Sequence, residues 1–69
     1  MDNLNIENEM KFLRMLFNDT SERFNKVHWM FIKDKCKGLL PYIKDEFDIF
    51  LIEEYDRYAD TMLRVINIV

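Results

Sequence analysis

Residues 41–66 read PYIKDEFDIFLIEEYDRYADTMLRVI and form the longest segment of the chain with a helical pattern. Apolar residues recur there at spacings of three and four, which predicts an amphipathic helix. We expect Pro41 to begin this helix, because proline fixes the helical φ angle at a position whose N–H would have no partner. One apolar stripe of the helix contains Phe47, Leu51, Tyr55, Tyr58, Met62 and Val65.

A second apolar stripe lies on a different side of the same helix and contains Ile49, Ile52, Ala59, Leu63 and Ile66. Together the two stripes are broader than contact with one short helix would bury. A chain of 69 residues also builds only a marginal core by itself. We therefore expect a second copy to cover the surplus, which would give a dimeric assembly of the four-helix type.

Two shorter helices are predicted upstream, over residues 5–18 and 21–37, each boundary being approximate. Residues 18–22 between them read NDTSE and are weak helix formers. Asp19 and Glu22 resemble a capping box, which would restart the helix. With the last helix, the predicted fold is a single all-α domain, a small bundle of three helices.

The boundary between the first two helices has an alternative. The apolar spacing runs unbroken through this boundary, in the series Met10, Leu13, Phe17, Thr20, Phe24, Val27 and Phe31. A turn would have no reason to preserve that spacing. One continuous helix, and hence an αα-hairpin, therefore stays open. At the other end of the second helix, we expect Gly38 to stop it in the left-handed conformation.

Composition narrows the class of protein. A hydrophobic fraction of 49% indicates an ordered domain, and a single cysteine excludes a disulfide framework. The first ten residues, MDNLNIENEM, lack the basic start and the apolar run of a targeting peptide. The apolar runs of the chain are too short to cross a membrane. We therefore expect a cytoplasmic protein without membrane association.

Residues 27–37 read VHWMFIKDKCK and hold the only histidine, tryptophan and cysteine of the chain. Geometry argues against a shared metal site, because His28 and Cys36 would lie about 12 Å apart along a helix while each ligand must lie ~2 Å from the ion. A catalytic thiol at Cys36 would need a base within hydrogen-bond reach, and the histidine is two turns away. We expect no enzymatic activity, no catalytic residue, no cofactor and no metal.

The run Trp29-Met30-Phe31-Ile32 predicts an interface, because four consecutive helical residues cannot all face one interior. A tryptophan with aromatic and methionine neighbours is typical of surfaces that bind proteins. The residues expected to contact a partner are Trp29, Met30, Phe31, Ile32, Ile49, Ile52 and Leu63.

Charge is segregated along the chain, with a net charge of −3 over residues 1–22, +5 over 23–44 and −5 over 45–69. The basic segment contains Arg23, Lys26, Lys33, Lys35, Lys37 and Lys44. Three interpretations stay open. These cations neutralise the acidic helices within the bundle or the dimer, they bind an acidic protein, or they bind the phosphates of a nucleic acid.

The expected function is that of a non-enzymatic protein–protein interaction module, a homodimer that presents an aromatic and methionine-rich helix face. The abundance of Ile, Asn, Lys, Phe and Tyr is typical of AT-rich genomes. This composition and the small size suit a regulator or inhibitor from a phage or mobile element that binds a host protein. The alternative is a small nucleic-acid-binding regulator that uses the basic segment 23–44.

Overall fold

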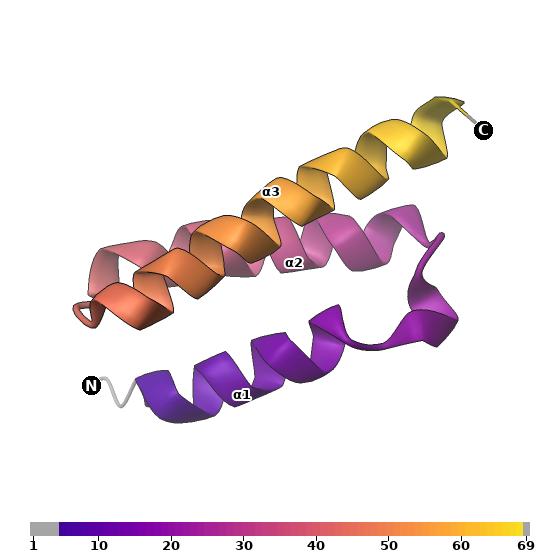
Figure 1. The fold of residues 1–69 in the computed structure, drawn as a ribbon. Helices are drawn as coiled ribbons and strands as arrows, with labels where there is room; N and C mark the ends of the chain where they lie inside the picture. The colour runs from indigo at the N-terminus through magenta and orange to yellow at the C-terminus, as the bar shows by residue number, and fades with distance from the viewer. Residues whose placement is uncertain (1–4, 69) are drawn as a thin grey trace.

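A computed structural model describes residues 5–68 of the chain and the side chains of residues 5–67. The described residues form three α-helices, joined by two short 3-10 turns (Figure 1). In chain order the elements are α1 (Ile6–Phe17), a turn at Thr20–Glu22, α2 (Lys26–Leu39), a turn at Leu40–Tyr42 and α3 (Glu46–Ile68). The all-α fold with three helices is therefore confirmed.

Each helix begins at a side chain that accepts a hydrogen bond from a backbone N–H of the first turn. Such bonds satisfy donors that have no partner inside the helix. The three bonds run from Asn8 N–H to Asn5 Oδ1 (3.1 Å), from Val27 N–H to Asn25 Oδ1 (3.0 Å) and from Asp48 N–H to Asp45 Oδ2 (3.2 Å).

The predicted break between the first two helices is confirmed, and the alternative of one continuous helix is wrong. Asp19 Oδ1 accepts hydrogen bonds from the backbone N–H (3.2 Å) and the hydroxyl (2.6 Å) of Ser21. These local bonds compete with helical ones and hold residues 20–22 in a single 3-10 turn. As a result α2 begins at Lys26 and not near residue 21.

Gly38 and Pro41 do not have the roles that we predicted. Gly38 lies inside α2, and no described residue has a positive φ. Pro41 lies in the second 3-10 turn. The φ angles of a 3-10 turn and of an α-helix both match the fixed φ angle of proline. The chain then becomes extended at Ile43, which is buried, and α3 begins only at Glu46.

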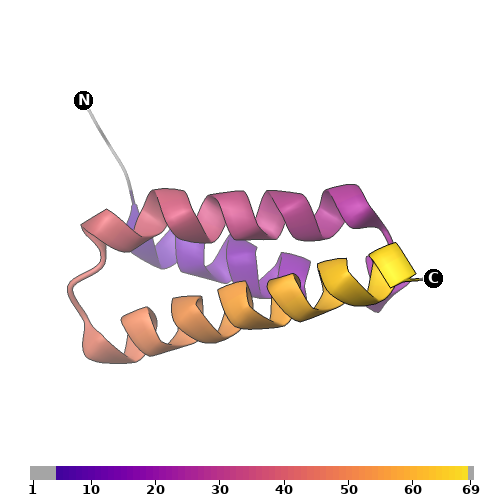
Figure 2. The same cartoon turned by 90° about the horizontal axis from the view of Figure 1, so that it is seen from above.

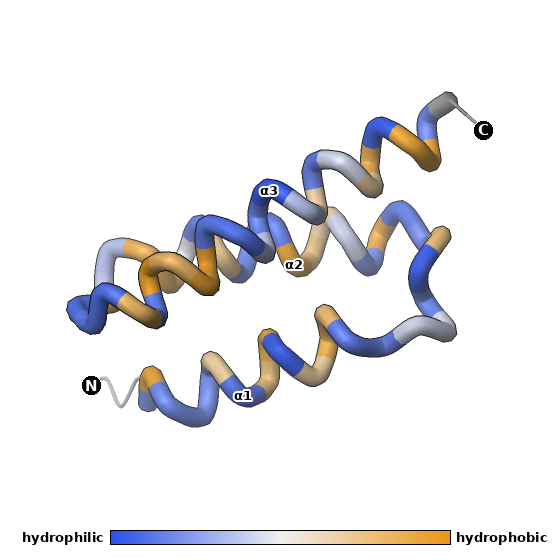
Figure 3. Tube along the Cα trace, viewed as in Figure 1, coloured by the Kyte–Doolittle hydropathy of each residue, from blue (hydrophilic) through white to orange (hydrophobic). Residues whose placement is uncertain are grey.

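The core lies where the three helices face one another, and apolar residues recur along each of them (Figure 3). Its residues are Met10, Leu13, Trp29, Ile32, Cys36, Leu39, Ile43, Ile52, Tyr55, Ala59 and Met62. On α3 the buried side takes Ile52 and Ala59 from one predicted stripe, and Tyr55 and Met62 from the other. The second stripe is thus buried or half-buried within the chain, whereas Phe47, Tyr58 and Val65 of the first stripe are exposed.

The helices are not equally close to one another. α3 packs most closely along α2, and α1 also packs along α2. α1 and α3 pack less closely, and in the view of Figure 1 the C-terminal end of α3 rises away from α1, whereas Figure 2 shows α1 and α3 on the same side of α2. Part of α3 is therefore left without a neighbouring helix.

The position of Gly38 leads to a test of the fold. An added Cβ would meet nothing within 4 Å, and the backbone there is helical. We expect Gly38→Ala to raise the free energy of unfolding by about 0.5–1 kcal/mol, because alanine is the better helix former. Urea denaturation followed by circular dichroism would measure this. A lower stability would mean that Gly38 is a left-handed cap after all.

Candidate interaction surface

The most exposed apolar side chains of α2 lie on the side that faces away from the core. The solvent-exposed fractions are 70% for Val27, 51% for Met30 and 47% for Phe31. The carboxylate of Asp34 is exposed on the same side, one turn further along the helix. We call these four residues the α2 outer face.

A hollow of about 560 Å³ extends from this face toward α3. Its apolar lining consists of Val27, Met30, Phe31 and the half-buried Leu63 of α3, and its polar lining consists of Lys33, Asp34 and Lys37. Toward α1, the ring of Phe31 meets that of Phe12 edge to face, with 6.5 Å between the ring centroids. The apolar surface is therefore continuous across parts of all three helices.

The structure divides the residues that we predicted to contact a partner. Met30 and Phe31 are exposed, and Ile49 and Leu63 are half-buried. Trp29, Ile32 and Ile52 are almost completely buried in the core of the chain itself. These three are therefore left out of the candidate surface. In a helix, residues three apart share a side, so Trp29 and Ile32 both point inward while Met30 and Phe31 between them point outward.

Trp29 holds the core together at the start of α2. Its ring packs against Phe17 of α1 and Tyr58 of α3, at centroid distances of 5.9 and 5.4 Å. Its indole Nε1–H donates a hydrogen bond to the carbonyl oxygen of Arg23 at 2.6 Å. The tryptophan that suggested a binding hot spot is instead an anchor between the helices and the preceding turn.

Two residues of the α2 outer face, Asp34 and Val27, were not among those predicted to contact a partner, and the sequence holds a signal for Val27. Together with Phe31 it continues the apolar spacing of α1 past the break. Because the chain reverses at residues 18–25, the residues in phase with the core of α1 point away from the core in α2. The apolar spacing that continues across the boundary between α1 and α2 was therefore the signal in the sequence for this exposed position.

Two of the six basic residues are used inside the bundle. Lys33 Nζ contacts Asp56 and Asp60 of α3 at 3.2 and 3.3 Å, and Lys35 Nζ contacts Glu9 of α1 at 2.5 Å. The hydrogen bond with Asp56 is the main cause that raises the pKa of Lys33. The structure therefore shows that acidic residues of the same chain neutralise these two lysines.

The other four basic residues, Arg23, Lys26, Lys37 and Lys44, are exposed. They come from the turn before α2, from both ends of α2 and from the segment before α3. The basic segment is thus divided between internal ion pairs and separate exposed cations.

Cys36 and His28 are both buried in the bundle. Burial, followed by the nearby charge of Asp56, raises the pKa of the Cys36 thiol to about 11, whereas Lys33 acts in the opposite direction. The His28 ring packs edge to face on Trp29, and its Nε2 has no hydrogen-bond partner among the described residues. Cys36 is part of the hydrophobic core, and His28 is a buried polar residue beside Trp29.

Within residues 5–68, no group of three or more His, Cys, Asp or Glu side chains is placed to hold a metal ion. In the same part of the chain, no helix has the length and apolar character needed to cross a membrane. Comparisons with protein-family models, with curated proteins and with solved structures return no match.

The raised pKa of Cys36 gives a second test. Since the unfolded thiol loses its proton first, this group favours unfolding as the pH rises from the ordinary pKa of 9.0 toward about 11. We expect stability to fall over that range more in the wild type than in Cys36→Ala. Lys33, whose pKa is raised from 10.5, is present in both proteins, so the difference between them reports the thiol. Urea denaturation at several pH values would measure both variants, and equal pH dependence would contradict the burial of the thiol.

Proposed function

We propose that this protein is a non-enzymatic protein–protein interaction module that binds another protein through the α2 outer face. The observation that supports this is the exposure of Val27, Met30 and Phe31 beside a hollow of about 560 Å³. Adjacent exposed apolar residues of this kind cost solubility, and they commonly mark sites of association.

The chemistry of this face suits protein recognition. Aromatic and methionine side chains are enriched at interfaces, and methionine adapts its shape to different partners. Asp34 and Lys37 lie next to the apolar residues and can orient a partner through charge. The face therefore combines an apolar centre with a polar edge, as protein interfaces do.

We propose a regulatory or inhibitory role, because the thiol and the imidazole of this chain do not form an exposed pair. Its thiol and its imidazole are both buried in the core. A free cysteine fits a reducing compartment, and we therefore propose a cytoplasmic location. A regulator or inhibitor that covers a surface of a host protein needs only to bind that protein. Such a role suits a chain of 69 residues.

Site-specific photo-crosslinking would test this function. We would place a photoreactive phenylalanine analogue at Phe31, and separately at Met15, which is an exposed apolar residue of α1 outside the α2 outer face. In cells of the native host, we expect crosslinks to a discrete foreign protein from position 31 and not from position 15.

Binding of the captured protein would then be measured directly. We expect Phe31→Ala to weaken it about thirtyfold, the effect of losing about 2 kcal/mol at an interface centre. Met15→Ala should leave it unchanged. Equal crosslinking at both positions, or binding that does not respond to Phe31→Ala, would contradict the proposal. Loss of binding with charge removal at Lys26 and Lys37, together with binding to a DNA duplex, would favour nucleic-acid recognition instead.

A further inference from the structure

α3 has a second exposed apolar surface, separate from the α2 outer face. The solvent-exposed fractions are 63% for Phe47 and 55% for Phe50, and Tyr58 and Val65 are also exposed. Together with Glu54 and Thr61, these residues form what we call the α3 stripe. The stripe runs beside the buried residues of α3 over about 27 Å, at 1.5 Å per residue.

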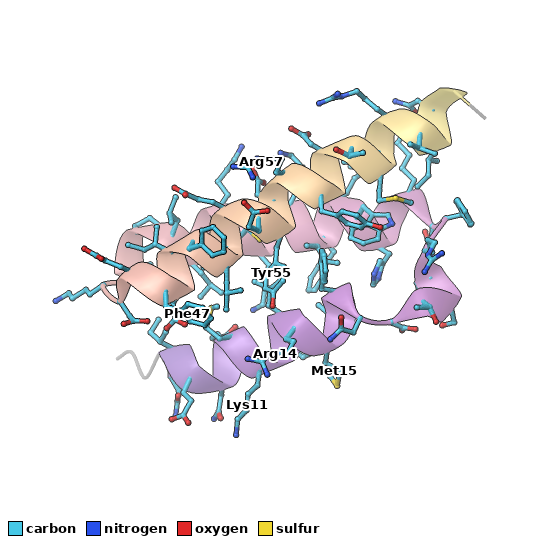
Figure 4. The ribbon with its side chains drawn as sticks, viewed as in Figure 1. Lys11, Arg14, Met15, Phe47, Tyr55 and Arg57 are labelled. Carbon is cyan, nitrogen blue, oxygen red and sulfur yellow. The ribbon has the colours of Figure 1, made fainter. Side chains whose placement is uncertain are left out.

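The α3 stripe lies on the side of α3 that is turned away from α2. Asp56 and Asp60 face α2, because both contact Lys33. Helical geometry then puts Glu54 and Tyr58 roughly on the opposite side. Neighbouring helices cover this side only in part, at Tyr58, whose ring packs against Phe17 of α1 and Trp29 of α2 with 5.1 and 5.4 Å between the ring centroids. Arg57, next to the stripe, projects from the side of α3 away from α1 (Figure 4).

Charges along the α3 stripe and its edge are divided between the two halves of the helix. The N-terminal half carries Glu46, Glu53 and Glu54, and the C-terminal half carries Arg57 and Arg64. The remaining acidic residue of the C-terminal half, Asp60, is engaged by Lys33 on the α2 side. When two copies of such a helix run antiparallel, the acidic half of each copy lies beside the basic half of the other.

We propose that the α3 stripe binds the α3 stripe of a second copy of this chain, in antiparallel orientation about a two-fold axis near residues 55 and 56. In this register Glu54 lies opposite Arg57 of the second copy, and Glu46 lies near its Arg64. Phe50 packs over Thr61 of the other copy, and Phe47 packs beside Val65. A two-fold contact requires such a self-complementary surface.

The parallel orientation is disfavoured by the same residues. It would place Glu54 against Glu54 and Arg57 against Arg57, and like charges brought together in an interface oppose association. The α2 outer face belongs to another helix and takes no part in this contact. The surface proposed for a foreign partner therefore stays free in this dimer.

Charge exchange across the proposed contact would test it. We would compare the wild type with Glu54→Arg, Arg57→Glu and the double variant, using sedimentation equilibrium over a dilution series. Each single change should weaken dimerisation about tenfold, because every dimer contains the contact twice. The double variant restores opposite charges across the two-fold axis, so it should dimerise within about threefold of the wild type.

Control measurements distinguish an effect on the dimer contact from an effect on the fold. Glu54 and Arg57 also form an ion pair within one copy, but surface pairs contribute little to stability, so all variants should keep the helical signal of the wild type. Lys11→Glu, an exposed charge reversal on α1, should leave dimerisation unchanged. Phe50→Ser should weaken it without changing the charge of the chain.

Three outcomes would overturn the inference. The first is a monomer at every concentration, and the second is a dimer whose affinity does not respond to Glu54→Arg or Phe50→Ser. The third is a dimer lost with Phe31→Ala, which would mean that the α2 outer face binds the second copy, and it would overturn the proposed function as well. The first two leave that function untouched, so a failure of the dimer contact alone can be told apart from a failure of both proposals.

Discussion

The burial of Trp29 is the constraint on which the rest of this structure depends. Its ring meets α1 through Phe17 and α3 through Tyr58, and its N–H is satisfied by the carbonyl oxygen of Arg23 in the turn before α2. Once this large side chain points inward, the rotation of α2 about its own axis is fixed. Met30 and Phe31 must then point outward, so the same constraint that builds the core also creates the exposed surface.

Ion pairs reinforce this arrangement from both sides of α2. Lys33 contacts two carboxylates of α3, while Lys35 contacts Glu9 of α1 and lies 5.6 Å from the centre of the Phe12 ring. Partly exposed pairs of this kind add modest stability, but they disfavour other rotations of the helices, in which like charges would meet. Two lysines of the basic segment therefore help to place α2 between Glu9 of α1 and the acidic residues Asp56 and Asp60 of α3.

Two separate apolar surfaces then have two proposed roles. The α2 outer face would bind a foreign protein, and the α3 stripe, on the far side of α3 from α2, would bind a second copy. A dimer formed in this way carries two α2 outer faces that point away from its centre. Such a bivalent arrangement would strengthen binding to an oligomeric target through effective concentration, without any further contact.

By itself, the sequence determined the all-α fold class, the approximate positions of the helical segments and the segregation of charge, and it favoured a break after α1 without excluding one continuous helix. Spacings of three and four are a property of one helix, and they are visible without its neighbours. The ends of α2 and the start of α3 were less predictable. Asn25 and Asp45 cap these helices, whereas Gly38 and Pro41, the stronger signals in the sequence, lie inside a helix and a 3-10 turn.

Only the tertiary structure decided which residues of an apolar helix are buried. Trp29 and Ile32 became core while Met30 and Phe31 stayed exposed, and α3 buried a side that lies between its two predicted stripes. Periodicity gives the spacing along a helix, but the angle about its axis is set by the neighbours that pack against it. The sequence could therefore place the candidate surface in the run 29–32. Which residues of that run are exposed was decided only by the packing of the three helices.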